Sequence, residues 1–274
     1  MDQSKPKPLT NLLTVIALSM LAYTLAVGLH EHLGHTLACL LLGGHPAELG
    51  AFYVNCTYGS MPDLGIRLVA LAGPLVSLLT GAVALALFDR DRSGSAARRY
   101  LLWLYATISL MIAAGYLLFS GVSGIGDFGT VADGVFFGAQ PEWAFRVGLT
   151  LAGVAAYVGV VVLSVRRMDR LIGGAGGERV RRAQWLALSS YLTGVVLSVL
   201  VGLLNPHGLV IVLTSSAASS LGGTSGLAWS MQMLNRKKDT GQAPFVLKRS
   251  WPWIVTGLAV AAVYAALLGP TIRP

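Results

Sequence analysis

The chain has 274 residues, of which 54% are hydrophobic and only 12% are charged. Soluble domains carry about 25% charged residues, so this chain has too few charges to cover a water-exposed surface. The composition excludes an ordinary soluble enzyme, a disordered protein and a fibrous repeat, and it predicts an integral membrane protein. The net charge of +8 does not indicate nucleic-acid binding, because no stripe of basic and aromatic residues accompanies it.

Long apolar runs predict transmembrane helices, since about 20 apolar residues cross the ~30 Å hydrocarbon core of a bilayer. We therefore expect an all-α polytopic fold in a single integral membrane domain, residues 1–274. The runs are continuous rather than alternating, which argues against a barrel. The first run would be ~48 Å long, so its helix must tilt, project or break. The seven predicted spans are 11–42, 65–88, 100–120, 144–165, 184–204, 208–234 and 251–269.

The charged residues predict the orientation of these spans. Four segments share an excess of Lys and Arg, and all four fall on one side if the spans alternate. Because cytoplasmic loops carry such an excess, we expect the N-terminus in the cytoplasm. The low cysteine content and the lack of a eukaryotic targeting motif favour a bacterial inner membrane. The apolar pattern resumes after His35, which favours an uncleaved first span over a signal peptide. The basic segments are the N-terminus and loops 89–99, 166–183 and 235–250, whereas the other side holds Glu48, Asp63, Asp127, Asp133 and Glu142.

Three of the five histidines crowd into one segment near the end of the first predicted span. Ionisable residues inside a span are costly and functional by default, so a metal or proton site is favoured over a structural network. At ~100° per residue, Glu31 and His35 lie ~40° apart on one face, and His32 lies ~60° from His35. His30 lies ~140° from His35 unless a π-bulge, common at functional sites, brings it round. The segment reads Leu29-His30-Glu31-His32-Leu33-Gly34-His35.

The zinc motif H-E-x-x-H places two histidines one turn apart, with a glutamate base beside the first. This chain has Gly34 where the second histidine is needed, so two near-matches stay open. His30-Glu31 with His35 is the motif lengthened by one residue. Glu31-His32 with His35 is the motif with its first two letters exchanged. All three histidines are therefore candidate metal ligands, and Glu31 is the candidate catalytic base.

The segment ends in Gly34-His35, and the next predicted span contains Ala72-Gly73-Pro74. In these features the chain resembles the site-2-protease-like family of intramembrane zinc metalloproteases, in an uncharacterised bacterial branch with His-Glu-x-x-Gly-His. The resemblance covers about residues 20–135. It implies a metalloprotease-like core over 11–135, followed by additional transmembrane helices over 136–274.

The resemblance also implies an aspartate ligand near a later span, for which Asp127 and Asp133 are the candidates. We prefer Asp127, because Gly124, Gly126 and Gly129 around it permit unusual backbone beside a site.

The implied cofactor is Zn²⁺, which His30 or His32, His35 and Asp127 would hold with one position left open. Glu31 would take the proton of a bound water and pass it to the leaving amine. The implied activity is hydrolysis of peptide bonds in membrane-protein or peptide substrates, as in a zinc metalloendopeptidase.

The first outer loop, 44–64, contains a strand-like run at 52–54. The resemblance implies a hairpin at the membrane edge, which can pair with an extended substrate; a plain connecting loop is the alternative. In the same loop, Cys56 is a candidate thiolate ligand or a disulfide partner of Cys39, and we expect it to be a free thiol.

Two other functions remain open from the sequence. A metal-ion or proton transporter, or a metal-binding membrane protein, fits the concentration of histidines, cysteines and carboxylates on the outer side. Against transport, the third to seventh predicted spans contain almost no ionisable residue that could continue a relay inward. A non-catalytic scaffold with a degenerate metal site would explain the altered spacing of the motif.

Overall fold

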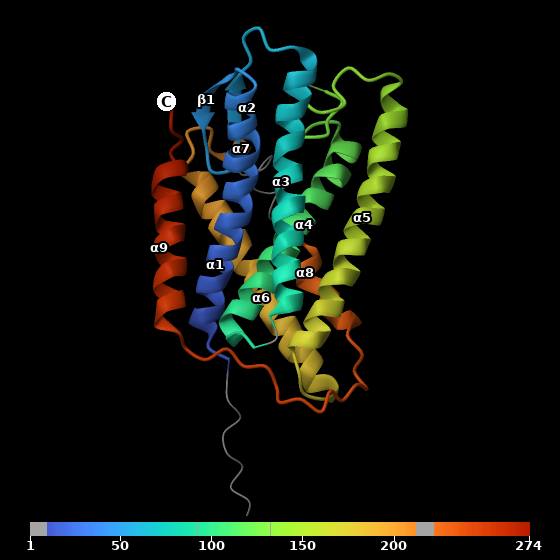
Figure 1. Ribbon diagram of the computed structural model, residues 1–274, viewed down its shortest axis with the longest axis vertical. Helices are drawn as coiled ribbons and strands as arrows, with labels where there is room; N and C mark the ends of the chain where they lie inside the picture. Colours follow the sequence, from blue (N-terminus) through green and yellow to red (C-terminus); the bar gives the residue numbers. More distant parts are fainter. Residues whose placement is uncertain (1–9, 92, 132, 212–221) are drawn as a thin grey trace, which may run out of the picture.

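The computed structural model of the chain describes residues 10–91, 93–131, 133–211 and 222–274. Six of its helices are long and apolar enough to cross a membrane, which confirms an all-α polytopic membrane protein. Figure 1 shows them side by side in one elongated bundle. They are Leu12–Leu41, which combines α1, η1 and α2, then α3 (Asp63–Arg90), α4 (Ala96–Ser123), α5 (Glu142–Leu171), α6 (Gly176–Leu203) and α9 (Trp251–Leu268).

The predicted span 208–234 is not one long helix in the described part of the chain. Residues 212–221 lie outside the described residues, and short elements flank them: α7 (Leu209–Ile211), α8 (Gly226–Trp229) and the 3₁₀ helix η3 (Ser230–Met233). Glycine and serine are abundant in this segment and have low helix propensity. The chain nevertheless passes from one end of the bundle at α7 to the other end before α9 returns it (Figure 1).

The first span is continuous but changes its helical type. It begins as α1 (Leu12–Gly28), becomes the eight-residue π-helix η1 (Leu29–Thr36) and ends as α2 (Leu37–Leu41). Asn11 caps its start, where its side chain accepts a hydrogen bond from the Thr14 amide at 3.0 Å. α1 packs against α4, α6 and α9.

The two ends of the bundle differ in charge. The start of α1 and the basic segments that follow α3, α5 and η3 all lie at one end (Figure 1). The opposite end carries the hairpin formed by β1 (His45–Leu49) and β2 (Val54–Thr57), which pair antiparallel with a bulge between Pro46 and Glu48. The loop therefore contains the hairpin that the resemblance implied, but the predicted strand at 52–54 lies mostly in the turn, because β2 begins only at Val54.

Our expectation of a free Cys56 is wrong, because Cys56 forms a disulfide with Cys39. Cys56 lies on β2 opposite Pro46, and Cys39 lies on α2, so the disulfide joins the hairpin to the end of the first span. Gly44 makes this close packing possible, since a Cβ there would lie 2.9 Å from the Cys39 sulfur. A separation of 17 residues in the sequence could not reveal this proximity.

Candidate metal centre

The π-helix brings His30 and His35 together. Their Nε2 atoms lie 3.3 Å apart, although five positions separate the residues. A π-helix closes its hydrogen bonds from i to i+5, so one turn holds one residue more than an α-helical turn. The two histidines therefore occupy neighbouring positions on one face, as an H-E-x-x-H pair would in an α-helix.

Asp127 from the loop between α4 and α5 completes a group of three. Its Oδ2 lies 3.2 Å from His30 Nε2, and its Oδ1 lies 3.5 Å from His35 Nε2. Burial would raise the pKa of the Asp127 carboxyl, but electrostatic attraction to His35 and His30 lowers it well below the usual range. Oδ2 is buried and faces Nε2 of His30. An ionised oxygen in this position is suited to bind a cation, and the three residues together could hold a metal ion.

The loop that carries Asp127 is held by its own backbone and by α3. Gly124 ends α4 with a φ of 81°, and its carbonyl accepts a hydrogen bond from the Thr130 amide at 2.9 Å. Arg67 on α3 donates to the carbonyl oxygens of Val135 at 2.6 Å and Phe137 at 2.7 Å. These contacts fix the loop over the histidines.

Groups on α3 orient both imidazole rings. Nδ1 of His35 lies 2.8 Å from the carbonyl oxygen of Val69, and Nδ1 of His30 lies 3.0 Å from the Ser77 hydroxyl. A carbonyl oxygen only accepts, so Nδ1 of His35 carries the proton and, in the neutral ring, Nε2 keeps a free lone pair. Val69, Gly73 and Ser77 are four residues apart, so they form one stripe of α3. Such second partners are typical of metal-binding histidines.

Two glycines allow α3 to approach the histidine segment. A Cβ on Gly34 would lie 2.6 Å from the Cα of Gly73, which is closer than real Cβ atoms come. Pro74 lies inside α3, which continues through it as one helix. Gly34 and Gly73 therefore allow α3 to lie directly against the turn that carries His30 and His35.

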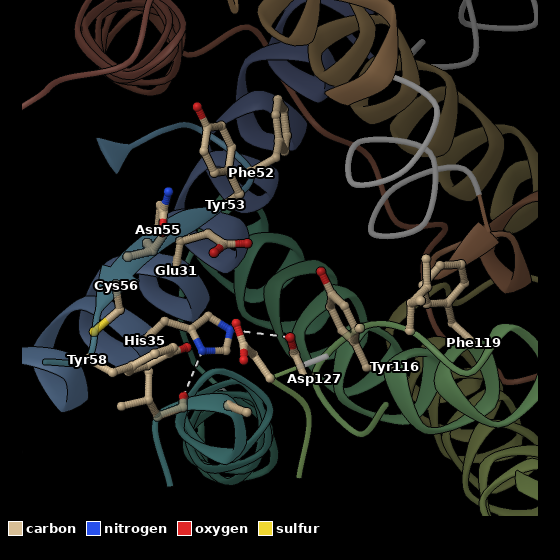
Figure 2. Close-up of a pocket in the computed structure, with 16 residues that line it drawn as sticks. Glu31, His35, Phe52, Tyr53, Asn55, Cys56, Tyr58, Tyr116, Phe119 and Asp127 are labelled. Carbon is tan, nitrogen blue, oxygen red and sulfur yellow. Dashed lines mark hydrogen bonds and ion pairs between the residues drawn. The ribbon is translucent and has the colours of Figure 1, made fainter. Parts of the chain in front are cut away.

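A cavity of about 310 Å³ opens beside the three candidate ligands. Glu31 is buried and lines this cavity together with His35 and Asp127 (Figure 2). Tyr116 from α4 lines it as well, and its ring stacks on His30 with the centroids 4.9 Å apart. A carboxylate therefore faces the same space as two of the candidate ligands, which is the place a general base requires.

The structure does not bring the other two candidates to this group. His32 lies on another face of the helix, where it lines an apolar cleft with Tyr264 of α9. Asp133 lines the cavity but is not part of the three-residue cluster. The π-helical turn selects His30 rather than His32 as the partner of His35.

Sequence reasoning missed Ser77, Tyr116 and Arg67, which support the site from α3 and α4. The sequence indicated Ser77 only weakly: it lies one helical turn after Gly73, so it is on the same face of the helix as the glycine that faces the histidines. Tyr116 and Arg67 gave none, since their roles depend on how separate helices pack.

No protein-family model, no curated protein and no solved structure matches this chain. Its function must therefore be inferred from the geometry of the site.

Proposed function

We propose that this protein is an intramembrane zinc metalloprotease that hydrolyses peptide bonds of membrane substrates. The observation that carries this proposal is the close approach of His30, His35 and Asp127. The two Nε2 atoms lie 3.3 Å apart, and Asp127 places Oδ2 3.2 Å from Nε2 of His30 and Oδ1 3.5 Å from Nε2 of His35. Ligand atoms ~2.0–2.1 Å from a tetrahedral zinc lie ~3.3 Å from one another. The three measured distances are close to this value, and one ligand atom from each residue lies within 4.8 Å of the other two. Nitrogen with carboxylate oxygen is a ligand set that zinc accepts.

Three protein ligands leave a fourth position for water or substrate, as in catalytic rather than structural zinc sites. When bound, zinc would polarise the scissile carbonyl and lower the pKa of its water. Glu31 accepts the proton of the attacking water and then donates it to the leaving amine. The Val69 carbonyl and the Ser77 hydroxyl keep the imidazole rings oriented throughout.

The hairpin supports an extended polypeptide as the substrate. One edge of β2 pairs with β1, and residues Val54, Asn55 and Cys56 of β2 line the cavity. An extended peptide added to the other edge of β2 would run past Glu31 and His35. Main-chain hydrogen bonds would hold such a peptide whatever its side chains.

The metal-binding end belongs, in this proposal, to the periplasmic side of a bacterial inner membrane, with the N-terminus in the cytoplasm. Two features support this orientation. The basic loops lie at the end opposite to the site, and cytoplasmic loops are typically basic. The Cys39–Cys56 disulfide lies at the site end, and disulfides persist in oxidising compartments. Reporter fusions after residues 60 and 94 should report opposite compartments.

The decisive variant is Glu31→Gln, which keeps the shape of the side chain and removes the base. Purified wild type loaded with zinc should cleave members of a library of fluorogenic peptides and single-span membrane peptides. Glu31→Gln should retain about one zinc per chain and lose cleavage by at least ~100-fold, the range general bases contribute. Asp63→Asn, at the start of α3 outside the cavity lining, should behave as wild type.

Undiminished cleavage by Glu31→Gln would overturn the proposal. Loss of zinc from Glu31→Gln, without cleavage by the wild type, would favour the alternative of a metal carrier that uses Glu31 as a ligand. Such a result would still leave His30, His35 and Asp127 as metal ligands.

A further inference from the structure

The C-terminal segment of the chain reaches the hairpin beside the cavity. Ile272 accepts a hydrogen bond from the Leu49 amide at 2.8 Å and donates one back to the Leu49 carbonyl at 2.9 Å. This two-way pairing is an isolated antiparallel bridge on the edge of β1 that β2 does not use. Figure 1 shows the C-terminus at the hairpin end of the bundle. Of the hairpin's two outer edges, the edge of β1 is thus occupied at Leu49, whereas β2 lies beside the cavity.

Side chains reinforce this pairing around one carboxylate. Glu48 accepts two hydrogen bonds from Arg273, at 2.9 and 3.0 Å, and one from the Tyr53 hydroxyl at 3.1 Å. The Tyr53 hydroxyl also lies 3.2 Å from the Thr271 hydroxyl, which accepts a hydrogen bond from the Asn205 amide at 2.7 Å. Tyr53 is therefore tied both to β1 and to the C-terminal segment.

The turn at residues 50–53, which we call the outer wall, is the part of the hairpin that these contacts hold. Two of its residues, Phe52 and Tyr53, line the cavity that contains Glu31. The hydroxyl of Tyr264 on α9 donates to the carbonyl of Ala51, so α9 holds the wall from the bundle side. Support for the wall comes from α9 and the residues after it, which lie outside the core 11–135.

We propose that Glu48 and Arg273 are positioning residues, which hold the outer wall so that a substrate peptide aligns along β2 at the metal centre. One exposed ion pair alone would contribute little. Here the Glu48–Arg273 ion pair acts together with the backbone hydrogen bonds between Leu49 and Ile272 and with the Tyr53 hydroxyl. Loss of the ion pair therefore weakens all of these contacts. Only the kinetic part of this inference rests on the proposed function. Attachment of the wall is a property of the fold.

Hydrogen exchange of the full-length protein in detergent tests the attachment without any need for metal or activity. Arg273→Ala should increase the exchange rate of the Leu49 amide at least ~10-fold, and Arg273→Lys should restore more than half of the protection. Arg170→Ala is the matched control, because it removes an exposed arginine that pairs with Asp89 at the opposite end of the bundle. Unchanged exchange at Leu49 in Arg273→Ala would overturn the inference, whether or not the protein is a protease.

In the active enzyme, Arg273→Ala should raise KM for peptides about 3- to 10-fold with kcat changed less than 2-fold and zinc content unchanged. Glu48→Gln should act in the same direction. An active Arg273→Ala variant with wild-type KM would show that the wall does not position substrate. If neither the wild type nor any variant cleaves a peptide, the proposed function fails. The hydrogen-exchange result alone then decides whether the C-terminal segment holds the outer wall.

Discussion

The Nε2 atoms of His30 and His35 face each other at 3.3 Å across a single turn of π-helix. In a regular α-helix these residues would point ~140° apart. The spacing between His30 and His35 is one residue longer than the spacing between the two histidines of H-E-x-x-H. A π-helical turn contains one residue more than an α-helical turn, so the two rings still meet. The altered spacing is therefore compatible with an intact ligand pair and does not by itself indicate a degenerate site.

His35→Ala should abolish metal binding, because the variant loses one of three ligands. We expect about one metal ion per chain in the wild type and less than 0.1 in the variant, counted by elemental analysis of protein purified in detergent. His32→Ala is the matched control from the same turn and should keep its metal. Metal retained by His35→Ala, or lost by His32→Ala, would contradict the ligand assignment.

Gly73→Ala should disrupt the site through its backbone position. The added methyl group would lie 2.8 Å from Nε2 of His30 and closer still to Nε2 of His35, so it would enter the space of a bound ion. We expect metal affinity to fall at least ~100-fold, measured by competition with a zinc-binding dye. Gly148→Ala on α5 is the control, because a Cβ there meets no atom within 4 Å. The control should melt at or slightly above the wild-type temperature, since alanine favours a helix by up to ~1 kcal/mol over glycine.

Ser77→Ala should weaken the site without removing a ligand. Loss of a group that orients a metal-binding histidine typically costs 10–100-fold in metal affinity, and we expect a value within roughly that range here. Thr80→Ala on the same helix is the control, because its hydroxyl donates only to the carbonyl of Val76 in its own helix at 2.8 Å. Equal affinities for the two variants would show that Ser77 does not orient His30.

Glu48 should make stability depend on pH. Hydrogen bonds from Arg273, with smaller contributions from Tyr53 and His207, hold the pKa of this carboxyl below its usual value. A lowered pKa stabilises the fold above the unfolded pKa of about 4.3, and that contribution is lost as pH falls through the folded pKa. The difference in melting temperature between wild type and Glu48→Gln should therefore be largest near pH 6 and shrink toward pH 3. A difference independent of pH would contradict this assignment.

The sequence predicted most of the fold because membrane spans are encoded locally. Each long apolar run had to become a helix, since a bilayer offers no other partner for the backbone groups. Five predicted spans correspond to α3, α4, α5, α6 and α9 within a few residues at each end, apart from the first turns of α6 and the last turns of α5. The first predicted span, 11–42, matches the continuous helix Leu12–Leu41, which changes its helical type without breaking. The 208–234 segment was harder, because its small and polar residues do not specify one long helix.

The candidate site was only partly predictable, because some of its residues share one helical turn and others come from segments distant in the chain. The sequence by itself determined that histidines and a glutamate share one turn inside a membrane helix, where such groups are costly without a role. Whether His30 or His32 joins His35 depended on the π-helical turn. The partner aspartate, the Cys39–Cys56 bond and the support from the C-terminal segment depended on contacts between segments distant in the chain. Only the tertiary structure could decide these, because they arise from how closely glycine-lined helices and a folded-back hairpin pack.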